Sequence, residues 1–210
     1  MRTKNPPVGG FFVLGYTSGT FMDRLGKLFG SPARLKLLRL FLFNQGSALT
    51  LTDVATRSSL ENDTARRALA ELVVAGVLTK RGERAKAAYR LNPRFEHLSA
   101  LERFIRDTTV LSPRYVVSSL KRSGSLRLVA LSGFFTGVIE AQIDLLVAGD
   151  NLDARILARA VHGLEAELGR EIRYAAFETS DFRYRLGVYD RLLRDVFDYP
   201  HRLLVDRVGL

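Results

Sequence analysis

The stretch 131–150, LSGFFTGVIEAQIDLLVAGD, contains residue types that take part in phosphate chemistry. A glycine turn separates two apolar runs, and the second run carries one carboxylate, Asp144. Enzymes that transfer phosphoryl groups hold Mg²⁺ on oxygen ligands supplied in close pairs. Two residues before Asp144 the chain has Gln142, which is neutral and a poor magnesium ligand. A lone Asp144 cannot assemble a two-metal centre, so we predict no catalytic residue and no metal site here.

A second set of residues suits contact with the phosphates of a nucleic acid. Between Lys80 and Arg94 the chain has six Lys or Arg residues against a single acid, Glu83. This density favours phosphate contact with release of counterions, and a solvated basic turn is the plain alternative. More polar and basic residues fall close together from Asn62 onward. The residues predicted to contact nucleic acid are Asn62, Thr64, Arg66, Arg67, Lys80, Arg81, Arg84 and Lys86.

Other chemistries find less support in the sequence. The chain has no cysteine, which excludes disulfides, thiolate metal sites and cysteine nucleophiles and fits a reducing cytoplasm. His162 and His201 have no acid at a useful spacing, so we expect both to be structural. No cofactor is predicted.

The basic residues lie on a predicted series of three helices and a hairpin. Ser31 and Pro32 begin a helix with a capping hydroxyl and a proline in its first turn, and this helix ends at 44–46. Its apolar face is predicted to consist of Leu35, Leu38 and Leu42. A short helix at 52–57 and a tight turn at 58–60 lead into a third helix at 62–75. Alternating residues then predict two strands, 77–80 and 88–91, joined by a polar tip.

A connector follows the hairpin. The segment 96–107 is predicted to be an amphipathic helix with one apolar face. The residues of that face are Leu98, Leu101, Phe104 and Ile105. They are expected either to close the core of their own domain or to form a twofold dimer contact. Pro113 opens the next helical stretch, so the domain boundary is placed near 107–113.

Strands and helices alternate in the C-terminal half. Strands are predicted at 126–131, 142–147 and 172–177, helices at 114–122, 152–168 and 180–197, and a short extended piece at 201–205. Asn151 or Asp150 is expected to cap the helix at 152–168. Apolar strands of this kind indicate a sheet covered by helices. We therefore predict an α+β protein of two domains, the second built on a mixed sheet with helices.

Length and charge agree with two domains of different roles. The 210 residues, 47% of them apolar, are enough to bury a core in each domain. Residues 1–107 carry 18 Lys and Arg against 9 acids, and residues 108–210 carry 14 against 13. This asymmetry is expected when one domain meets a polyanion and the other does not. We assign a flexible leader to 1–21, the basic domain with its following helix to 22–107, and the second domain to 108–210.

No apolar run is long enough to span a membrane, so a cytoplasmic location without membrane contact is expected.

The N-terminal half resembles a known family over about residues 22–95. The segments LFGSPARLKLLRLFLFN, LTDVATRSSLENDTARRALAELVVAGVLTKR and AYRLNPRF are similar to the winged helix-turn-helix domain of small prokaryotic transcriptional regulators of the ArsR and MarR-like groups. The resemblance implies that the helix at 62–75 reads the major groove of double-stranded DNA and that the hairpin is a wing on the backbone. The metal-sensing sites of many ArsR-type proteins do not carry over, because no Cys or His cluster lies on these helices.

The C-terminal half, over about 115–205, resembles the small nucleotidyltransferases of the DNA polymerase beta superfamily. In that family a Gly-Ser pair grips the triphosphate, an Asp-x-Asp pair holds magnesium, and a third acid lies on a later strand. Here Ser132-Gly133-Phe134 replaces the Gly-Ser pair, Gln142 replaces the first acid, and Arg173 or Ala175 replaces the third. The resemblance implies an inactive relative, a pseudoenzyme. Ser132, Gly133 and Asp144 would line its vestigial nucleotide pocket, and Asp144 is expected to accept hydrogen bonds from the turn.

Three hypotheses follow for the whole chain. The favoured one is a DNA-binding transcriptional regulator that forms a homodimer and whose C-terminal domain serves sensing, dimerisation or docking of a small-molecule or protein effector. The second is an active nucleotidyltransferase with an autoregulatory DNA-binding domain, against which the missing acids count. The third is an antitoxin-like partner that binds another protein through its C-terminal fold.

Overall fold

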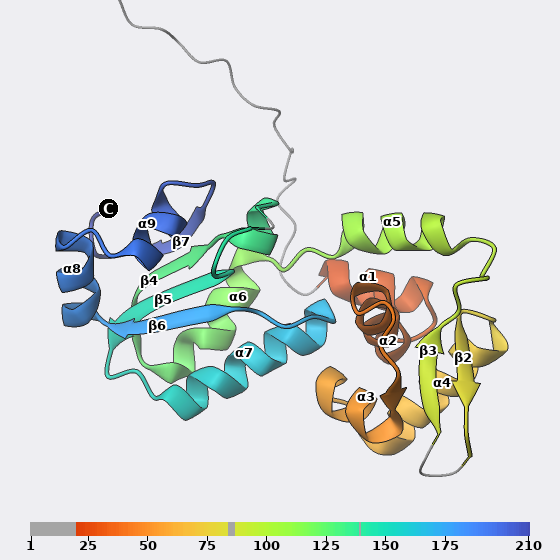
Figure 1. The fold of residues 1–210 in the computed structure, drawn as a ribbon. Helices are drawn as coiled ribbons and strands as arrows, with labels where there is room; N and C mark the ends of the chain where they lie inside the picture. The colour runs from red at the N-terminus through yellow and green to blue at the C-terminus, as the bar shows by residue number, and fades with distance from the viewer. Residues whose placement is uncertain (1–19, 84–86, 139) are drawn as a thin grey trace, which may run out of the picture.

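The computed structural model describes residues 20–83, 87–138 and 140–210 of the chain. These residues form an α+β protein with a sheet in each half, and the sheet of the C-terminal half is mixed (Figure 1). To this extent the predicted fold class is confirmed. We refer to 20–108 as the N-terminal unit and to 113–210 as the C-terminal unit. Residues 1–19 of the predicted leader lie outside the described ranges.

The N-terminal unit consists of helices and a small sheet. Its helices are α1 (Thr20–Leu28), α2 (Pro32–Phe43), α3 (Leu51–Ser58), α4 (Asn62–Val74) and α5 (Leu98–Thr108). The strands β1 (Leu49–Thr50), β2 (Leu78–Arg81) and β3 (Ala88–Leu91) pair antiparallel in the order β1-β3-β2. α1 was not predicted as a separate helix, and it begins two residues before the expected domain boundary.

Local hydrogen bonds fix where two of these helices begin. The Ser31 hydroxyl accepts a hydrogen bond from the backbone N–H of Arg34 at 3.0 Å, and Pro32 stands at the first helical position of α2, as predicted. α3 begins behind a capping box, in which the Thr50 hydroxyl and the Asp53 carboxylate each accept a hydrogen bond from the other's backbone N–H. Both signals are local in sequence, which is why they could be read without a structure.

α2 is buried on more than the predicted face. The residues buried in α2 are Ala33, Leu35, Leu37, Leu38, Arg39, Leu40, Phe41 and Leu42. One side packs in the N-terminal core, while Lys36, Arg39 and Phe43, at spacings of three and four, contact the C-terminal unit. α2 is therefore buried on two sides, in the core of its own unit and against the C-terminal unit.

The apolar face of α5 packs on its own unit. Ile105 is completely buried in the N-terminal core, and Leu98 and Leu101 pack against that core. The ring of Phe104, which is partly exposed, lies 6.0 Å from the ring of Phe29. Of the two roles predicted for this face, the structure therefore supports closure of the core.

The C-terminal unit is a four-stranded sheet with helices on both faces. Helix α6 (Pro113–Leu120) and the 3₁₀ turn η2 (Lys121–Ser123) precede β4 (Ser125–Leu131), and η3 (Gly133–Thr136) leads towards β5 (Leu145–Asp150). Then follow α7 (Ala154–Leu168), β6 (Tyr174–Glu178), α8 (Thr179–Gly187), α9 (Arg191–Phe197) and β7 (Arg202–Asp206). The strand order is β6-β5-β4-β7, with β5 and β6 parallel and the other pairs antiparallel. The parallel pair is joined by α7, as such a crossover requires.

The strand residues alternate between two cores. Val129, Leu131 and Val147 pack with α6 and α7 on one face, and Leu128, Ala130 and Leu146 pack with α8 and α9 on the other. Because both faces are covered, the strands are apolar at nearly every position. No helix within the described ranges is long and apolar enough to cross a membrane.

Several predicted boundaries in this unit were wrong. The predicted helix 180–197 is divided by Tyr189, whose φ of 55° ends α8 before Asp190 caps α9. The predicted strand 142–147 begins at Leu145 instead, and the predicted strand 172–177 begins at Tyr174. The cap of α7 is Asp153, which accepts hydrogen bonds from two N–H groups of the first turn, and neither Asn151 nor Asp150 fills that role.

Candidate functional site

The N-terminal end of α4 presents polar and basic side chains. Asn62, Arg66 and Arg67 are exposed, while Thr64 is half-buried. The opposite side of α4 is apolar, and its buried residues are Ala65, Ala68, Leu69 and Leu72. The spacing of these alanines and leucines fixes which face of the helix turns outward. Three of the four residues predicted on this helix are thus accessible.

Asp63 organises the two arginines of this turn. Its carboxylate Oδ1 lies 2.8 Å from Arg66 Nη1, and its backbone carbonyl accepts a hydrogen bond from Arg67 Nε at 3.3 Å. Both side chains of the ion pair are largely exposed, so the pair is worth less than about 1 kcal/mol and can exchange for another anion. The arginines are therefore oriented but remain available.

The strand β2 adds a basic surface. Thr79, Lys80 and Arg81 are all exposed, while Leu78 anchors the strand in the core. Thr79 pairs with Arg90 on β3, which is exposed as well. Arg84 and Lys86 lie outside the described residues.

The glycine turn and Asp144 bind each other closely. The carboxylate of Asp144 is 1% exposed and accepts four hydrogen bonds. Oδ1 accepts from the backbone N–H of Phe134 and from Arg173 Nη2, at 2.9 and 2.8 Å. Oδ2 accepts from the backbone N–H and from Nε of Arg173, at 3.1 and 3.0 Å. Asp144 thus accepts a hydrogen bond from the turn, as expected, and Arg173 occupies its remaining acceptor positions.

Electrostatics keep this carboxylate ionised. Burial alone would raise the pKa of Asp144, but the hydrogen bonds from Arg173 and from the Phe134 N–H outweigh it and hold the pKa below its ordinary value. The same contact raises the pKa of Arg173 above its ordinary value. Arg173, one of the two residues considered for the position of a third acid, thus neutralises the charge of Asp144.

The turn leaves little room beside Asp144. Ser132 is buried, and its hydroxyl donates to the carbonyl of Ile143 at 2.7 Å. Gly133 has a φ of 53°, and a Cβ there would lie 2.3 Å from Asp144 Oδ1, so only glycine fits. Gln142, by contrast, lies before β5, is exposed, and donates its backbone N–H to Asp195 Oδ2 at 2.8 Å. The structure brings Ser132, Gly133 and Asp144 together but separates Gln142 from them.

Phe134 connects this turn to the N-terminal unit. Its ring lies 6.4 Å from the ring of Phe43 on α2, in an edge arrangement, and the guanidinium of Arg170 lies 4.1 Å above it. Phe134 is thus part of the contact between the two units.

The C-terminal end of α7 is held by polar side chains of α2. Arg39 is 1% exposed and donates to the carbonyl of Glu167 at 3.0 Å and to the Thr109 hydroxyl at 3.1 Å. Lys36 pairs with the Glu167 carboxylate at 2.8 Å, and Asn44 Nδ2 donates to the Gly169 carbonyl at 2.7 Å. Cationic and amide donors at a helix C-terminus form hydrogen bonds with its free carbonyls, and positive charge there interacts favourably with the helix dipole. Burial lowers the pKa of Arg39 to about 10, which still leaves the guanidinium charged at neutral pH.

The backbones of the two units touch at Gly169. Its φ is 76°, and a Cβ there would lie 2.5 Å from the carbonyl carbon of Arg39. α3 also contacts the C-terminal unit, because His162 Nε2 lies 3.1 Å from the Thr56 carbonyl. Arg57 donates to Asn44 Oδ1 at 2.8 Å and lies 3.9 Å from Glu171. Sequence reasoning missed this interface, for which Arg39 within the apolar run 37–43 was the available signal.

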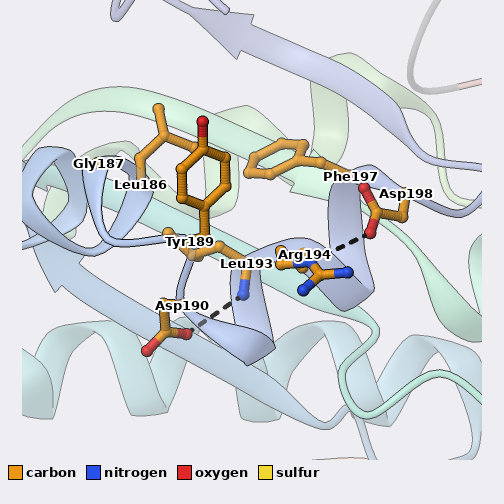
Figure 2. Close-up of a pocket in the computed structure, with 8 residues that line it drawn as sticks. All are labelled: Leu186, Gly187, Tyr189, Asp190, Leu193, Arg194, Phe197 and Asp198. Carbon is orange, nitrogen blue, oxygen red and sulfur yellow. Dashed lines mark hydrogen bonds and ion pairs between the residues drawn. The ribbon is translucent and has the colours of Figure 1, made fainter.

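A hollow of about 370 Å³ lies on the opposite side of the sheet from α7, between α8 and α9 (Figure 2). The charged groups that line it are engaged within the chain. Asp190 caps α9 through the N–H groups of Leu192 and Leu193 and pairs with Arg185, and Arg194 lies 3.5 Å from Asp198. The lining residues are Leu186, Gly187, Tyr189, Asp190, Leu193, Arg194, Phe197 and Asp198. None of them belongs to the predicted nucleotide pocket.

The described residues contain no group of three or more His, Asp or Glu side chains placed to hold a metal ion. His201 Nδ1 lies 2.9 Å from the Tyr199 carbonyl, and its ring packs against Phe197.

No protein-family model, no curated protein and no solved structure matches the chain.

Proposed function

We propose that this protein is a sequence-specific double-stranded DNA-binding transcriptional regulator whose N-terminal unit is a winged helix-turn-helix. The observation that carries the proposal is the joint exposure of Arg66 and Arg67 on α4 and of Lys80 and Arg81 on β2, with the apolar sides of both elements in one core. A helix and a basic strand presented in this way suit a major groove and the adjoining phosphate backbone.

The turn between α3 and α4 supports the same role. Ser59 adopts the left-handed conformation with a φ of 51°, and its N–H donates to the carbonyls of Ala55 and Thr56. The backbone N–H of Leu60 also donates to the Ala55 carbonyl, at 2.9 Å. A closed turn of this kind fixes the angle between two short helices, which a helix-turn-helix needs to place its second helix.

For the C-terminal unit we propose a nucleotidyltransferase-like module that has lost catalysis. The supporting contact is the guanidinium of Arg173 on the carboxylate of Asp144, because a bound cation would have to displace this charge-assisted pair. The unit would serve sensing, dimerisation or docking of an effector. Its route to the DNA-binding unit is the contact of α7 with α2 and α3, through Arg39, Asn44 and His162.

The test begins with selection of duplex fragments by the purified protein, followed by titration of the selected fragment at several salt concentrations. We expect Arg66→Ala with Arg67→Ala to weaken binding and to relax the preference for the selected sequence. We expect Lys80→Ala with Arg81→Ala to weaken binding to all duplexes and to lower the salt slope by about 2, since each phosphate contact contributes about 0.9.

The matched control removes two positive charges elsewhere on the same unit. Arg103 and Arg106 are exposed on α5, and their double alanine variant should retain the affinity and the salt slope of the parent. The proposal would be overturned if all three double variants bound duplex DNA with the same affinity and the same salt slope. Magnesium-dependent incorporation of labelled nucleotide that disappears in Asp144→Asn would instead support the nucleotidyltransferase.

A further inference from the structure

One face of α7 carries a basic stripe that the near-neutral total charge of the C-terminal half conceals. Arg155, Arg159 and His162 are all exposed and follow one another at spacings of four and three. Residues at these spacings lie on the same side of a helix. The opposite side of α7 is buried against the sheet through Leu157, Leu164 and other apolar residues. The stripe is therefore turned away from the core of its unit.

Glu165 Oε2 lies 3.5 Å from Nδ1 of His162, the last member of this stripe, but the carboxylates of α7 are not paired with its two arginines. Glu165 accepts a hydrogen bond from the backbone N–H of Ile172 at 2.8 Å, and Glu167 pairs with Lys36 of α2. Asp153 is occupied at the helix cap. No described residue forms a salt bridge with the guanidinium of Arg155 or Arg159, so both charges face solvent.

The stripe runs directly to the helix pair that we propose to read DNA. Its last member, His162, contacts the carbonyl of Thr56 near the end of α3. In Figure 1, the N-terminal end of α7, the helix α3 and the lower end of α4 lie along the same side of the molecule. The contacts of Arg39, Asn44 and Gly169 hold α7 in a fixed position against α2. Because α3 contacts both α7 and α4, the positions of the two basic surfaces are fixed relative to each other.

We propose that Arg155 and Arg159 bind the phosphate backbone of duplex DNA on the flank of the site that α4 reads. This inference rests on the proposed function and adds the C-terminal unit to the DNA interface. Arg155 and His162 are separated by seven residue steps, which span about 10 Å of helix at about 1.5 Å per residue. Because a base pair occupies about 3.4 Å of duplex, the flank must extend roughly three base pairs along α7 from the end of the stripe that contacts α3.

The consequence is a dependence of affinity on duplex length that originates in the C-terminal unit. Two phosphate contacts contribute about 1.8 to the slope of log affinity against log salt, at about 0.9 for each contact. These contacts carry no sequence information, so the preferred sequence should not depend on them.

The experiment compares two duplexes that contain the same selected site. The long duplex retains about ten base pairs on each side of the site, and the short duplex ends at the site itself. The test variant is Arg155→Ala with Arg159→Ala. The matched control is Arg183→Ala with Arg191→Ala, two exposed arginines on α8 and α9 at the opposite face of the sheet. Equal midpoints of urea unfolding verify that both variants are folded.

On the long duplex we expect the salt slope of the Arg155/Arg159 variant to fall by about 2 and its affinity at low salt to fall about tenfold or more. On the short duplex this variant should match the parent, and the control should match the parent on both. Equal slopes of test and control variants on the long duplex would overturn the inference while the parent still bound DNA. A parent that binds no duplex would instead remove the proposed function itself.

Discussion

Asp144→Asn probes the buried contact between the glycine turn and the strand that follows Arg173. The carboxylate accepts two hydrogen bonds at each oxygen, all four of them from Phe134 and Arg173. An asparagine side chain is isosteric but has one acceptor oxygen and one donor nitrogen. In either orientation it keeps two of the four bonds and places its N–H₂ against two donors. The buried charge of the pair is lost as well.

The expected loss of stability follows from these contacts. Hydrogen bonds to charged groups contribute about 1.5–3 kcal/mol each, and removal of one partner of a buried ion pair costs about 3–5 kcal/mol. The guanidinium of Arg173 is 45% exposed and can be rehydrated, which favours the lower end of that range. We therefore expect Asp144→Asn to lower the free energy of unfolding by about 3 kcal/mol at neutral pH.

The pH dependence gives this prediction a second readout. The pKa of Asp144 is lowered in the folded protein, so its stabilisation is complete above the unfolded pKa of about 4 and is lost as the pH falls through the folded pKa. Urea unfolding followed by circular dichroism should show a wide gap between parent and variant at neutral pH. The gap should become narrower only in acid, below about pH 4.

A surface ion pair provides the control. Arg194 and Asp198 lie 3.5 Å apart and are both more than half exposed, so Asp198→Asn should cost less than about 1 kcal/mol at any pH. A loss of the same small size for Asp144→Asn at neutral pH, or a gap that stays constant into acid, would refute the assignment of a buried, ionised Asp144.

Two further predictions concern the interface between α2 and α7. Gly169→Ala should cost about 2–4 kcal/mol in urea unfolding, because its Cβ would meet the α2 backbone at Arg39 in a left-handed conformation. An alanine at Gly163, inside α7, meets no atom within 4 Å and should instead stabilise by up to about 1 kcal/mol, so equal effects of Gly163→Ala and Gly169→Ala would contradict the contact. Arg39→Ala should cost about 3–5 kcal/mol and Arg39→Met clearly less, because methionine refills the space but leaves the Glu167 carbonyl unpaired. Equal unfolding midpoints for the two Arg39 variants would mean that the space left by the arginine side chain does not contribute to the loss of stability.

Much of the fold could be predicted because its signals are local. The start of α2 behind Ser31 and the paired strands of the hairpin depend on residues close in sequence. The boundaries in the C-terminal unit could not be placed as well, because several strand ends there are set by partners on distant segments. Gln142 illustrates the difficulty, since the apolar run after it predicted a strand from 142, but its N–H donates to Asp195 of α9. For the candidate site, the type and spacing of residues such as Arg66 predicted an exposed basic face on α4, while the exposed arginines of α7 were not singled out from the sequence.

The sequence alone determined an α+β chain with an excess of basic charge in its first half and a single acid at the glycine turn, because residue types and short spacings carry that information. Only the tertiary structure decided what these groups meet. Arg39 finds the Glu167 carbonyl 128 residues away, and Asp144 finds Arg173 29 residues away. Contacts between such distant segments depend on how whole elements pack, since each buried charge is stable only where packing supplies its partner.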